Sequence, residues 1–457
     1  MTEQFKDQGG VANMNPSALF RWLSSKFMTE MVSEKSLVKR RAKAEKLRLK
    51  KGLPHKVEYF HQINDGYSHL AMQLLQPLVE NYDIDLTCHL VQGPSGDNLP
   101  EPDLLLELSR RDSQQIAPHY GLSFPPCDDK PGIALVSIAE SILVNVGQDE
   151  FPAVAKAVGA ALWAGDSLGL EQLEEQFGRC DDAETRDRIE KGTARRRKLN
   201  HYSGAMFFYA GEWYWGVDRM YHLEKRLLEL GAKKGPDEAL LYPRPTIDWG
   251  GAKDDGSITL EFYPSLRSPY TSVIFQQTVS LAKNSGVKLL VRPVLPMVMR
   301  GVPATREKGL YIFRDAAREA RTLGLTWGSR IYDPIGKPVH RCYSLYPWAR
   351  QKDREVELLD CFLKAAFNDG VNTNSDRGMR QVVENAGLLW DEAKQHIDGS
   401  DMLQELEANR LAMYEFGSWG VPSYRLLDQS GKTVLALWGQ DRLWLFAREI
   451  KRLLNAP

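Results

Sequence analysis

Ser268 stands at a point where a serine hydroxyl could act on a bound anion. It follows the segment ITLEFY, which has the apolar pattern of a strand, and it precedes Pro269 and the helical run VIFQQTVSLAKNSG. Such a turn faces unpaired backbone N–H groups and the positive end of the helix dipole. A thiolate is stabilised there, and a serine can donate a hydrogen bond to its sulfur. A simple helix N-cap is the other interpretation, and the two roles are compatible.

The cysteines and histidines indicate no further chemistry. The five cysteines are scattered singly, at Cys88, Cys127, Cys180, Cys342 and Cys361. The chain lacks the C-x-x-C spacing that disulfide exchange uses, and an odd total is typical of a reducing compartment. None of the nine histidines falls in an H-x-x-x-H pair or a Cys/His cluster, so we expect no metal site.

Composition excludes several classes of protein. A length of 457 residues suggests two or three domains, and 43% hydrophobic with 26% charged residues is typical of a soluble globular protein. The net charge of −1 argues against nucleic-acid binding, which needs an excess of Lys and Arg. No apolar run approaches the ~20 residues of a membrane span. Because MTEQFKDQGG has no features of a secretion signal, we expect a cytoplasmic protein.

The elements around Ser268 recur earlier in the chain. The strand pattern VEYFHQ, the residues from Asp65 to His69, a helical run and the strand pattern IDLTCHLV come in the same order. Three pairs of residues lie 203 positions apart: Tyr67 and Tyr270, Asp112 and Asp315 (each in an Arg-Asp sequence opening a helical stretch), and Gly121 and Gly324. A constant offset over several motifs predicts a duplicated unit.

Each copy reads as strand, helix, strand, a long helical section, a hairpin and a last amphipathic helix. This order predicts a parallel strand–helix–strand unit and, with the hairpin, a thioredoxin-like plan. We therefore predict an α/β protein with two tandem thioredoxin-like domains, each carrying inserted helices, after a basic helical arm. The predicted boundaries are 1–54 for the arm, 55–235 and 257–457 for the domains, and 236–256 for a linker rich in Gly, Pro and charge.

The arm has an apolar stripe followed by a basic run. Asn15-Pro16 is a plausible helix start, and Phe20, Leu23, Phe27 and Met31 share one helical face. Residues 35–56 carry ten Lys or Arg against Glu45 alone. One interpretation is attachment to an anionic membrane surface or nucleic acid. We favour a solvated basic helix whose neighbour packs its apolar stripe onto the body or onto a second subunit.

Four motifs in the second half carry a family resemblance. They are Leu266-Arg267-Ser268-Pro269-Tyr270-Thr271, Lys308-Gly309-Leu310-Tyr311, Gly420-Val421-Pro422-Ser423 and Gly439-Gln440-Asp441-Arg442-Leu443. Together they resemble the kappa-class glutathione transferases and the 2-hydroxychromene-2-carboxylate isomerases, which are members of the DsbA-like thioredoxin superfamily. The resemblance covers nearly all of residues 257–450.

The resemblance implies glutathione as cofactor and a role for each motif. Ser268 would hydrogen-bond the glutathione sulfur. Val421-Pro422 resembles the family's cis-proline turn, where the Val421 backbone pairs with the tripeptide. Gln440 and Asp441 would receive the γ-glutamyl amine and carboxylate, although Asp441 could be only a helix cap beside Arg442.

Other positions of the resemblance have alternative roles or depart from the family pattern. Lys308 would meet the glycyl carboxylate, or it could be a solvated lysine. Residues 298–307, VMRGVPATRE, depart from the family's Asn-Lys-Pro-Pro stretch, and Gln440 stands where the family more often has Ser or Asn. The inserted helices offer candidate apolar walls, or plain core residues, at Trp327, Tyr343, Phe362 and Phe367.

The first half departs further from the family. Asp65-Gly66 replaces Ser-Pro, and residues 203–206 have no proline where the cis turn belongs. Asp65 would repel a thiolate unless its pKa were raised. We therefore interpret this half as a degenerate copy, and the fused copies as an internal pseudo-dimer or part of a homodimer.

These residues lead to one main hypothesis and two rivals. The main one is a glutathione-dependent transferase or isomerase acting on a hydrophobic, aromatic or conjugated small molecule. The first rival is a non-catalytic glutathione- or peptide-binding module or scaffold. The second, a disulfide oxidoreductase, conflicts with the absence of a C-x-x-C pair.

Overall fold

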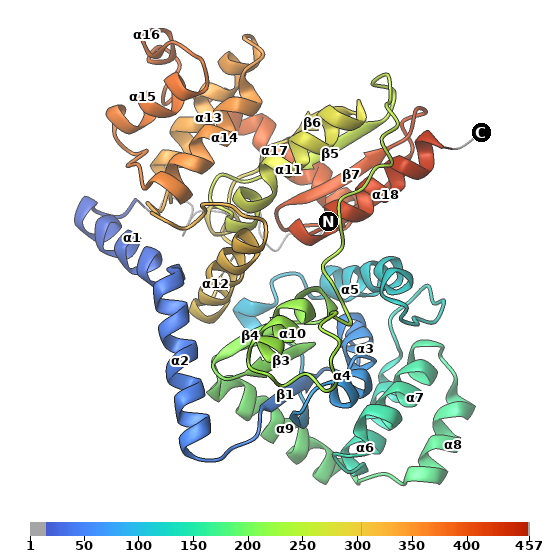
Figure 1. Ribbon diagram of the computed structural model, residues 1–457. Coiled ribbons are helices and arrows are strands. Elements are labelled where there is room, and N and C mark those ends of the chain that lie inside the picture. Colours follow the sequence, from blue (N-terminus) through green and yellow to red (C-terminus); the bar gives the residue numbers. More distant parts are fainter. Residues whose placement is uncertain (1–14, 303, 456–457) are drawn as a thin grey trace. The chain divides into compact units, whose positions relative to one another are not determined.

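A computed structural model describes residues 15–302 and 304–455 (Figure 1). The chain divides into two compact units: residues 38–245 form one, and the residues up to Leu37 together with those from Thr246 form the other. The predicted arm, residues 1–54, is thus shared between the units, and its first 14 residues lie outside the described ones. Of the predicted linker, residues 236–256 contain neither helix nor strand.

The 38–245 unit is built on a four-stranded sheet. Its strands are β1 (Lys56–His61), β2 (Asp85–Leu90), β3 (Met206–Tyr209) and β4 (Glu212–Trp215). They lie in the order β2-β1-β3-β4, with β1 and β2 parallel and the other pairs antiparallel. Strand β1 is buried at five of its six positions, and the buried ones include the polar residues Glu58 and His61 beside Val57, Tyr59 and Phe60.

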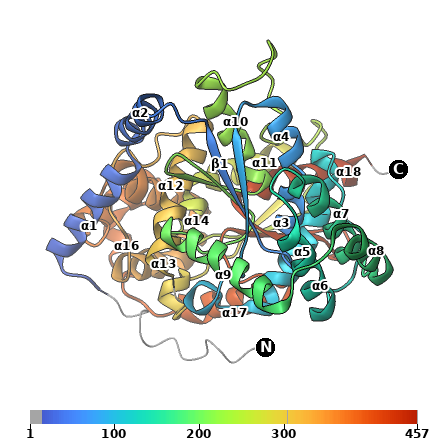
Figure 2. The ribbon, with the colours of Figure 1, turned by 90° about the horizontal axis from the view of Figure 1, so that it is seen from below.

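Nine helices and three short 3₁₀ turns in the described residues accompany this sheet. They are α2 (Glu34–Lys50), α3 (Gly66–Met72), α4 (Leu75–Asn81), α5 (Pro102–Ile116), α6 (Ile133–Asn145), α7 (Phe151–Trp163), α8 (Ser167–Phe177), α9 (Asp182–Lys198) and α10 (Met220–Glu229), with short 3₁₀ turns η2 (Gly96–Asn98), η3 (Ala117–Tyr120) and η4 (Val217–Arg219). The inserted α6, α7 and α8 pack on one another (Figure 2).

The second unit repeats this sheet. Its strands are β5 (Thr259–Tyr263), β6 (Lys288–Val291), β7 (Ser423–Leu427) and β8 (Thr433–Trp438). Their order is β6-β5-β7-β8, again with the first pair parallel and the others antiparallel. The predicted parallel strand–helix–strand unit and late hairpin are therefore present around both sheets.

Its helices place a long section between β6 and β7. They are α1 (Ala18–Val32), α11 (Pro269–Ser285), α12 (Arg306–Thr322), α13 (Lys337–Arg350), α14 (Glu355–Lys364), α15 (Asp376–Asn385), α16 (Trp390–Ala393), α17 (Met402–Glu415) and α18 (Leu443–Leu454), with short segments η5 (Met297–Arg300), η6 (Ala365–Asp369) and η7 (Gln440–Arg442). Helix α11 packs against both α12 and α18.

Each central strand carries a buried glutamate at the same place, 203 positions apart. Glu58 accepts hydrogen bonds from Arg195 at 2.8 Å and is paired with His89 at 3.0 Å. Glu261 accepts one from Arg292 at 2.8 Å and is paired with Arg425. Burial alone would raise the pKa of Glu58, but the hydrogen bonds from its partners bring it down to about 2.

Other contacts recur at the same spacing. Tyr67 donates to Asp112 at 2.7 Å, and Tyr270 donates to Asp315 at 2.8 Å. Both aspartates lie well inside α5 and α12, so the expectation that they open a helical stretch was wrong. Buried carboxylates need donors, and the tyrosine hydroxyls supply them.

Helix α1 corrects the expected packing of the arm. Its polar residues Arg21 and Ser25 are 1% and 4% exposed, whereas Phe20, Leu23 and Phe27 are more than half exposed. The apolar stripe therefore does not pack onto this unit, except at Met31. The N-cap is Ser17 rather than Asn15, whose side chain instead accepts a hydrogen bond from Arg21. Hydrogen bonds from the polar face decide this orientation.

Among the described residues, no helix is both long and apolar enough to cross a membrane.

Candidate functional site

The turn between β5 and α11 is built around Ser268. Its side chain caps α11 by accepting a hydrogen bond from the Thr271 N–H at 3.2 Å, as the N-cap interpretation requires. The same hydroxyl lies 3.4 Å from the Val421 carbonyl oxygen, to which it donates. Ser268 is half-buried. The structure therefore brings together two of the predicted site residues, which are 153 positions apart in the chain.

The segment that faces Ser268 contains the predicted cis peptide. The bond between Val421 and Pro422 is cis, which confirms that prediction. The Val421 side chain packs in a cluster with Tyr263 and Val294, and the Pro422 carbonyl accepts from Gly439 N–H at 3.0 Å. With its side chain in the core, Val421 presents backbone to the turn at Ser268.

Substitution of Gly420 tests whether the segment before the cis peptide packs closely against Trp438. A β-carbon added at Gly420 would lie 2.2 Å from the ring of Trp438, far inside van der Waals contact. We expect Gly420→Ala to displace Trp438 and to lower the free energy of unfolding by about 1–3 kcal/mol. Thermal unfolding of the full chain would measure this, with Gly309→Ala as the matched control because nothing lies within 4 Å of its added β-carbon. Equal stability of the two variants would contradict this account of the turn.

The side-chain amide of Gln440 has a hydrogen-bond partner for its nitrogen but none among the described residues for its oxygen. Its Nε2 donates to the buried Glu319 of α12 at 3.1 Å, and the residue is 2% exposed. Its Oε1 is buried and has no hydrogen-bond partner among the described residues. A buried amide oxygen without a partner can accept a hydrogen bond from an amine.

Asp441 pairs with its neighbour Arg442, which was one of the two interpretations of this residue. Its Oδ1 lies 3.5 Å from Arg442 Nη1, and its side chain is 18% exposed. Arg442 also donates to the Asp441 backbone oxygen. Asp441 thus sits in η7 at the start of α18, as predicted, and its carboxylate already has a cationic neighbour.

Lys308 lies in the first turn of α12. Its backbone N–H donates to the N-cap Thr305, and burial lowers the pKa of its ammonium group. The described residues provide no acceptor or carboxylate for its Nζ. Along α12, Lys308 is 11 residues before Glu319, the partner of Gln440, which corresponds to about 16 Å. Lys308 and the point where Gln440 contacts α12 therefore lie about three turns of that helix apart.

The four aromatic candidates belong to the core. Trp327, Phe362 and Phe367 are 6%, 0% and 0% exposed, and Trp327 stacks on Phe367. Tyr343 is also buried, but its hydroxyl accepts from Leu266 N–H at 3.2 Å and donates to Val294 O at 2.9 Å. The core interpretation holds for these rings, and Tyr343 adds a support for the turn that precedes Ser268.

Three further residues around the turn were missed by sequence analysis. Arg267 makes a two-pronged ion pair with Asp333, at 2.8 and 2.9 Å. Arg300, which is 2% exposed, donates to Leu295 O and to Trp419 O, and so holds the chain that enters the cis turn. Of these residues, only Arg267 had a signal in the sequence, because it is a charged residue inside the motif that contains Ser268.

The equivalent turn in the other unit has different chemistry. Asp65 caps α3 by accepting from Ser68 N–H at 2.9 Å. Burial raises the pKa of Asp65, and hydrogen bonds from Ser68 offset part of this effect. In place of a cis proline, Ala205 adopts φ = 54°, and its carbonyl accepts from Gly216 as that of Pro422 does from Gly439.

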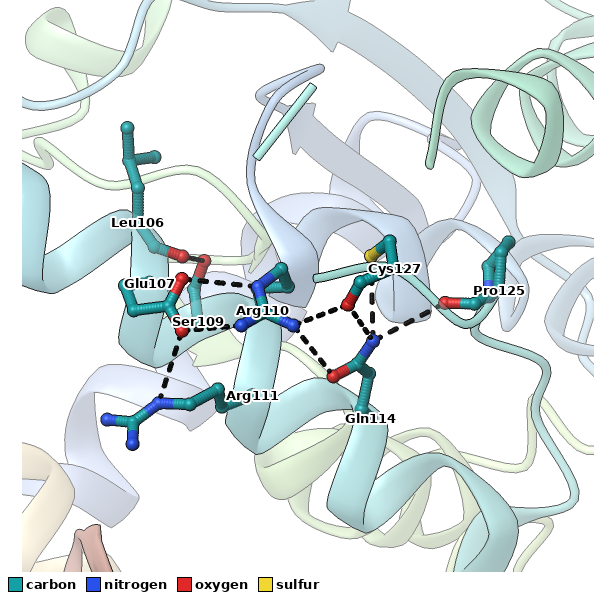
Figure 3. Close-up of polar contacts among 8 residues, drawn as sticks. All are labelled: Leu106, Glu107, Ser109, Arg110, Arg111, Gln114, Pro125 and Cys127. Carbon is teal, nitrogen blue, oxygen red and sulfur yellow. Dashed lines mark hydrogen bonds and ion pairs between the residues drawn. The ribbon is translucent and has the colours of Figure 1, made fainter. Parts of the chain in front are cut away.

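Helix α5 closes over this turn. The Gly66 N–H donates to Ser109 Oγ at 3.3 Å, and a β-carbon at Gly66 would lie 2.6 Å from the Ser109 carbonyl oxygen. Figure 3 shows Ser109 on α5 beside Arg110, which binds Glu107, Gln114 and the Cys127 carbonyl. The glycine in the Asp65-Gly66 pair is thus required by the close approach of α5.

Comparison with known proteins agrees with the fold of the second unit. Residues 259–451 match the family model of the DsbA-like thioredoxin domain, which confirms the predicted superfamily for this part of the chain. No curated protein matches the chain.

Two solved structures are similar to part of the chain. A probable DsbA oxidoreductase from Streptomyces coelicolor has 18% identity and a TM-score of 0.35, covering 44% of this chain and 91% of its own. A 2-hydroxychromene-2-carboxylate isomerase has 18% identity and a TM-score of 0.36, covering 43% and 95%.

Proposed function

We propose that residues 257–457 bind glutathione and use it as a kappa-type transferase or chromene-carboxylate-type isomerase, on a hydrophobic, aromatic or conjugated small molecule. The observation that carries this proposal is the meeting of the Ser268 hydroxyl and the Val421 carbonyl at the N-terminus of α11, beside the cis peptide. A helix N-terminus favours an anion, and a hydroxyl there can donate to a thiolate.

The residues present fit glutathione at several points. The unsatisfied Oε1 of Gln440 suits the γ-glutamyl amine, and the partner-free ammonium of Lys308 suits a carboxylate. Val421 offers its backbone carbonyl at the turn with Ser268, beside Pro422. When bound, glutathione supplies a nucleophilic sulfur.

The chain's own residues would then control that sulfur. Ser268 must turn its hydroxyl from the Val421 carbonyl towards the ligand, which frees that carbonyl for a ligand N–H. The N–H groups of the first turn of α11 would add positive potential. The thiol proton would leave to solvent, since the hydrogen-bond partners of the Ser268 hydroxyl among the described residues are the Val421 carbonyl and the Thr271 N–H, and neither is a titratable base.

The first unit is proposed to be a degenerate copy of the second. The shared strand order and the contacts repeated at the 203-position offset support a tandem duplication. Asp65, Ala205 and the closure of α5 over Gly66 support the loss of the glutathione site there. A pseudo-dimer or homodimer, and a cytoplasmic location, remain predictions.

Titration calorimetry of the full chain with glutathione tests this function. We expect one molecule bound per chain, and a 10- to 150-fold weaker affinity in Asp441→Ala, because a hydrogen bond to a charged group contributes about 1.5–3 kcal/mol. The matched control is Asp391→Ala, which removes an exposed carboxylate that pairs with Lys394. A panel of aromatic electrophiles and chromene-type acids, with and without glutathione, would then identify the reaction.

Absence of glutathione binding to the wild type would contradict the enzyme proposal and leave the scaffold interpretation. Two molecules bound per chain would contradict the degenerate copy.

A further inference from the structure

We propose that α1 is a positioning element of the site: through Arg21 and Asp333 it holds the turn that carries Ser268. The inference concerns a segment outside the matched domain, residues 259–451, and it rests on the proposed function of Ser268. Each step of the connection is a recorded contact within one compact unit.

The first step joins the turn to the loop after α12. Arg267, the residue before Ser268, donates from Nε and Nη2 to the two oxygens of Asp333, at 2.8 and 2.9 Å. The Asp333 side chain is 7% exposed and that of Arg267 is 20% exposed. Paired, charge-assisted bonds of this kind fix orientation as well as position. The direction in which the Ser268 turn leaves β5 thus depends on Asp333.

The second step joins Asp333 to α1. Arg21 Nη1 donates to the backbone oxygens of Asp333 and Ile335, at 3.0 and 2.8 Å. The Asp333 N–H donates to Ser25 Oγ at 3.2 Å. One turn further along α1, Thr29 Oγ1 accepts from the Ile331 N–H at 2.9 Å. Three successive turns of α1 therefore bind the backbone of residues 331–335, which lies more than 300 positions away.

The orientation of α1 indicates that this contact is specific. Burial of apolar surface alone would dock the helix through Phe20, Leu23 and Phe27. Instead these side chains are 61%, 52% and 57% exposed, and the guanidinium of Arg21 is buried. Burying a charged group is costly unless it is hydrogen-bonded, and Arg21 donates three hydrogen bonds from Nη1 and Nη2, whereas its buried Nε has no partner among the described residues. Specific hydrogen bonds from the polar face of α1, rather than burial of apolar surface, therefore hold the helix on this loop.

The other unit provides an internal comparison. At its turn, Asn64 occupies the place of Arg267, and its Oδ1 accepts from the side chain of Gln62, two residues earlier. No contact of Asn64 to a distant loop is recorded among the described residues. The support from α1 therefore accompanies the turn with Ser268 and is missing at the turn with Asp65.

A loosened turn would act on the thiol before it acted on binding. Ser268 must hold its hydroxyl within hydrogen-bond distance of a sulfur, and a shift of about 1 Å removes much of that contact. The groups proposed to bind the ends of glutathione lie on α12 and η7, outside the segment 331–335 that Arg21 and Ser25 hold. Loss of Arg21 should therefore raise the pKa of the bound thiol and leave the affinity almost unchanged.

The test compares full-length wild type, Arg21→Met, Ser25→Ala and the control Lys26→Met, an exposed cation on the same helix. Hydrogen exchange of residues 265–272 reports on the turn without any ligand, since the N–H groups of Ser268, Thr271 and Ser272 are all hydrogen-bonded within it. We expect exchange about 10- to 100-fold faster in Arg21→Met, a few-fold faster in Ser25→Ala, and unchanged in Lys26→Met. The second readout is the thiol pKa of bound glutathione, expected to rise in Arg21→Met at constant Kd.

Unchanged exchange of residues 265–272 in Arg21→Met, with faster exchange at 331–335, would overturn the proposal. If Arg21→Met does not fold, unchanged exchange of the same residues in Ser25→Ala overturns it. A fall in affinity without a rise in thiol pKa would also do so, since it would indicate a purely structural role. Failure of wild type to bind glutathione would end the proposed function, while hydrogen exchange would still decide the positioning role.

Discussion

Replacing Ser268 with alanine should lower turnover about 10- to 150-fold and leave glutathione binding largely intact. The hydroxyl is expected to donate one hydrogen bond to a thiolate, and a bond to a charged group contributes roughly 1.5–3 kcal/mol. The same energy should raise the pKa of the bound thiol by about 1 to 2 units. The turnover of any active electrophile and the pH dependence of that rate would measure both effects.

The control for this variant must separate catalysis from helix capping. Ser268 caps α11, so its removal also costs about 1 kcal/mol of stability. Ser375 caps α15 in the same way, accepting from Gly378 N–H at 3.1 Å. We expect Ser375→Ala to lower the unfolding temperature similarly while turnover and thiol pKa stay as in the wild type. Equal turnover of Ser268→Ala and wild type would show that the hydroxyl only caps the helix.

Acid should unfold the sheet β1–β4 before the sheet β5–β8. Three buried histidines, His61, His69 and His201, lie in the 38–245 unit, each at most 3% exposed. Burial lowers their pKa values to about 3, 4 and 3. In the other unit burial also lowers the pKa of His340, but that ring is only half-buried.

The sign follows from proton binding. A histidine with a pKa near 6.5 in the unfolded chain takes up a proton that the folded unit excludes. Its contribution to stability is therefore complete above pH 6.5 and is lost as the pH falls towards the folded values. At pH 4 the loss is on the order of 3 kcal/mol for His61 and for His201, and somewhat less for His69. The sum is comparable with a domain's whole stability of roughly 5–15 kcal/mol.

Hydrogen exchange of the full chain between pH 7 and pH 4 would measure this, with intrinsic rates corrected for pH. We expect β1 and β3 to lose protection at a higher pH than β5 and β7. In His69→Gln, which removes one titrating group, the transition should move to lower pH. Simultaneous loss of protection in both sheets, or an unchanged transition in His69→Gln, would contradict the assignment.

The sequence by itself determined many elements of the second unit and the location of the turn at Ser268. Alternating apolar residues located β5 and β6. The helical run between them predicted the helix α11 that connects the two strands. The position of Ser268 at a helix N-terminus also followed from local sequence, because propensity and turn chemistry act between residues near one another in the chain. The cis bond at Val421-Pro422 was expected from the family resemblance, and the structure contains it.

Only the tertiary structure decided which polar groups meet across the chain. The pairing of Arg267 with Asp333, 66 positions later, leaves no local pattern in the sequence. The exposed stripe of α1 also contradicts its periodicity, because periodicity shows which residues share a face but not which face is buried. The need for glycine at position 66 is explained only by the Ser109 backbone, which lies beside it in the folded chain. Contacts between distant segments depend on packing geometry, and a single sequence does not carry that geometry.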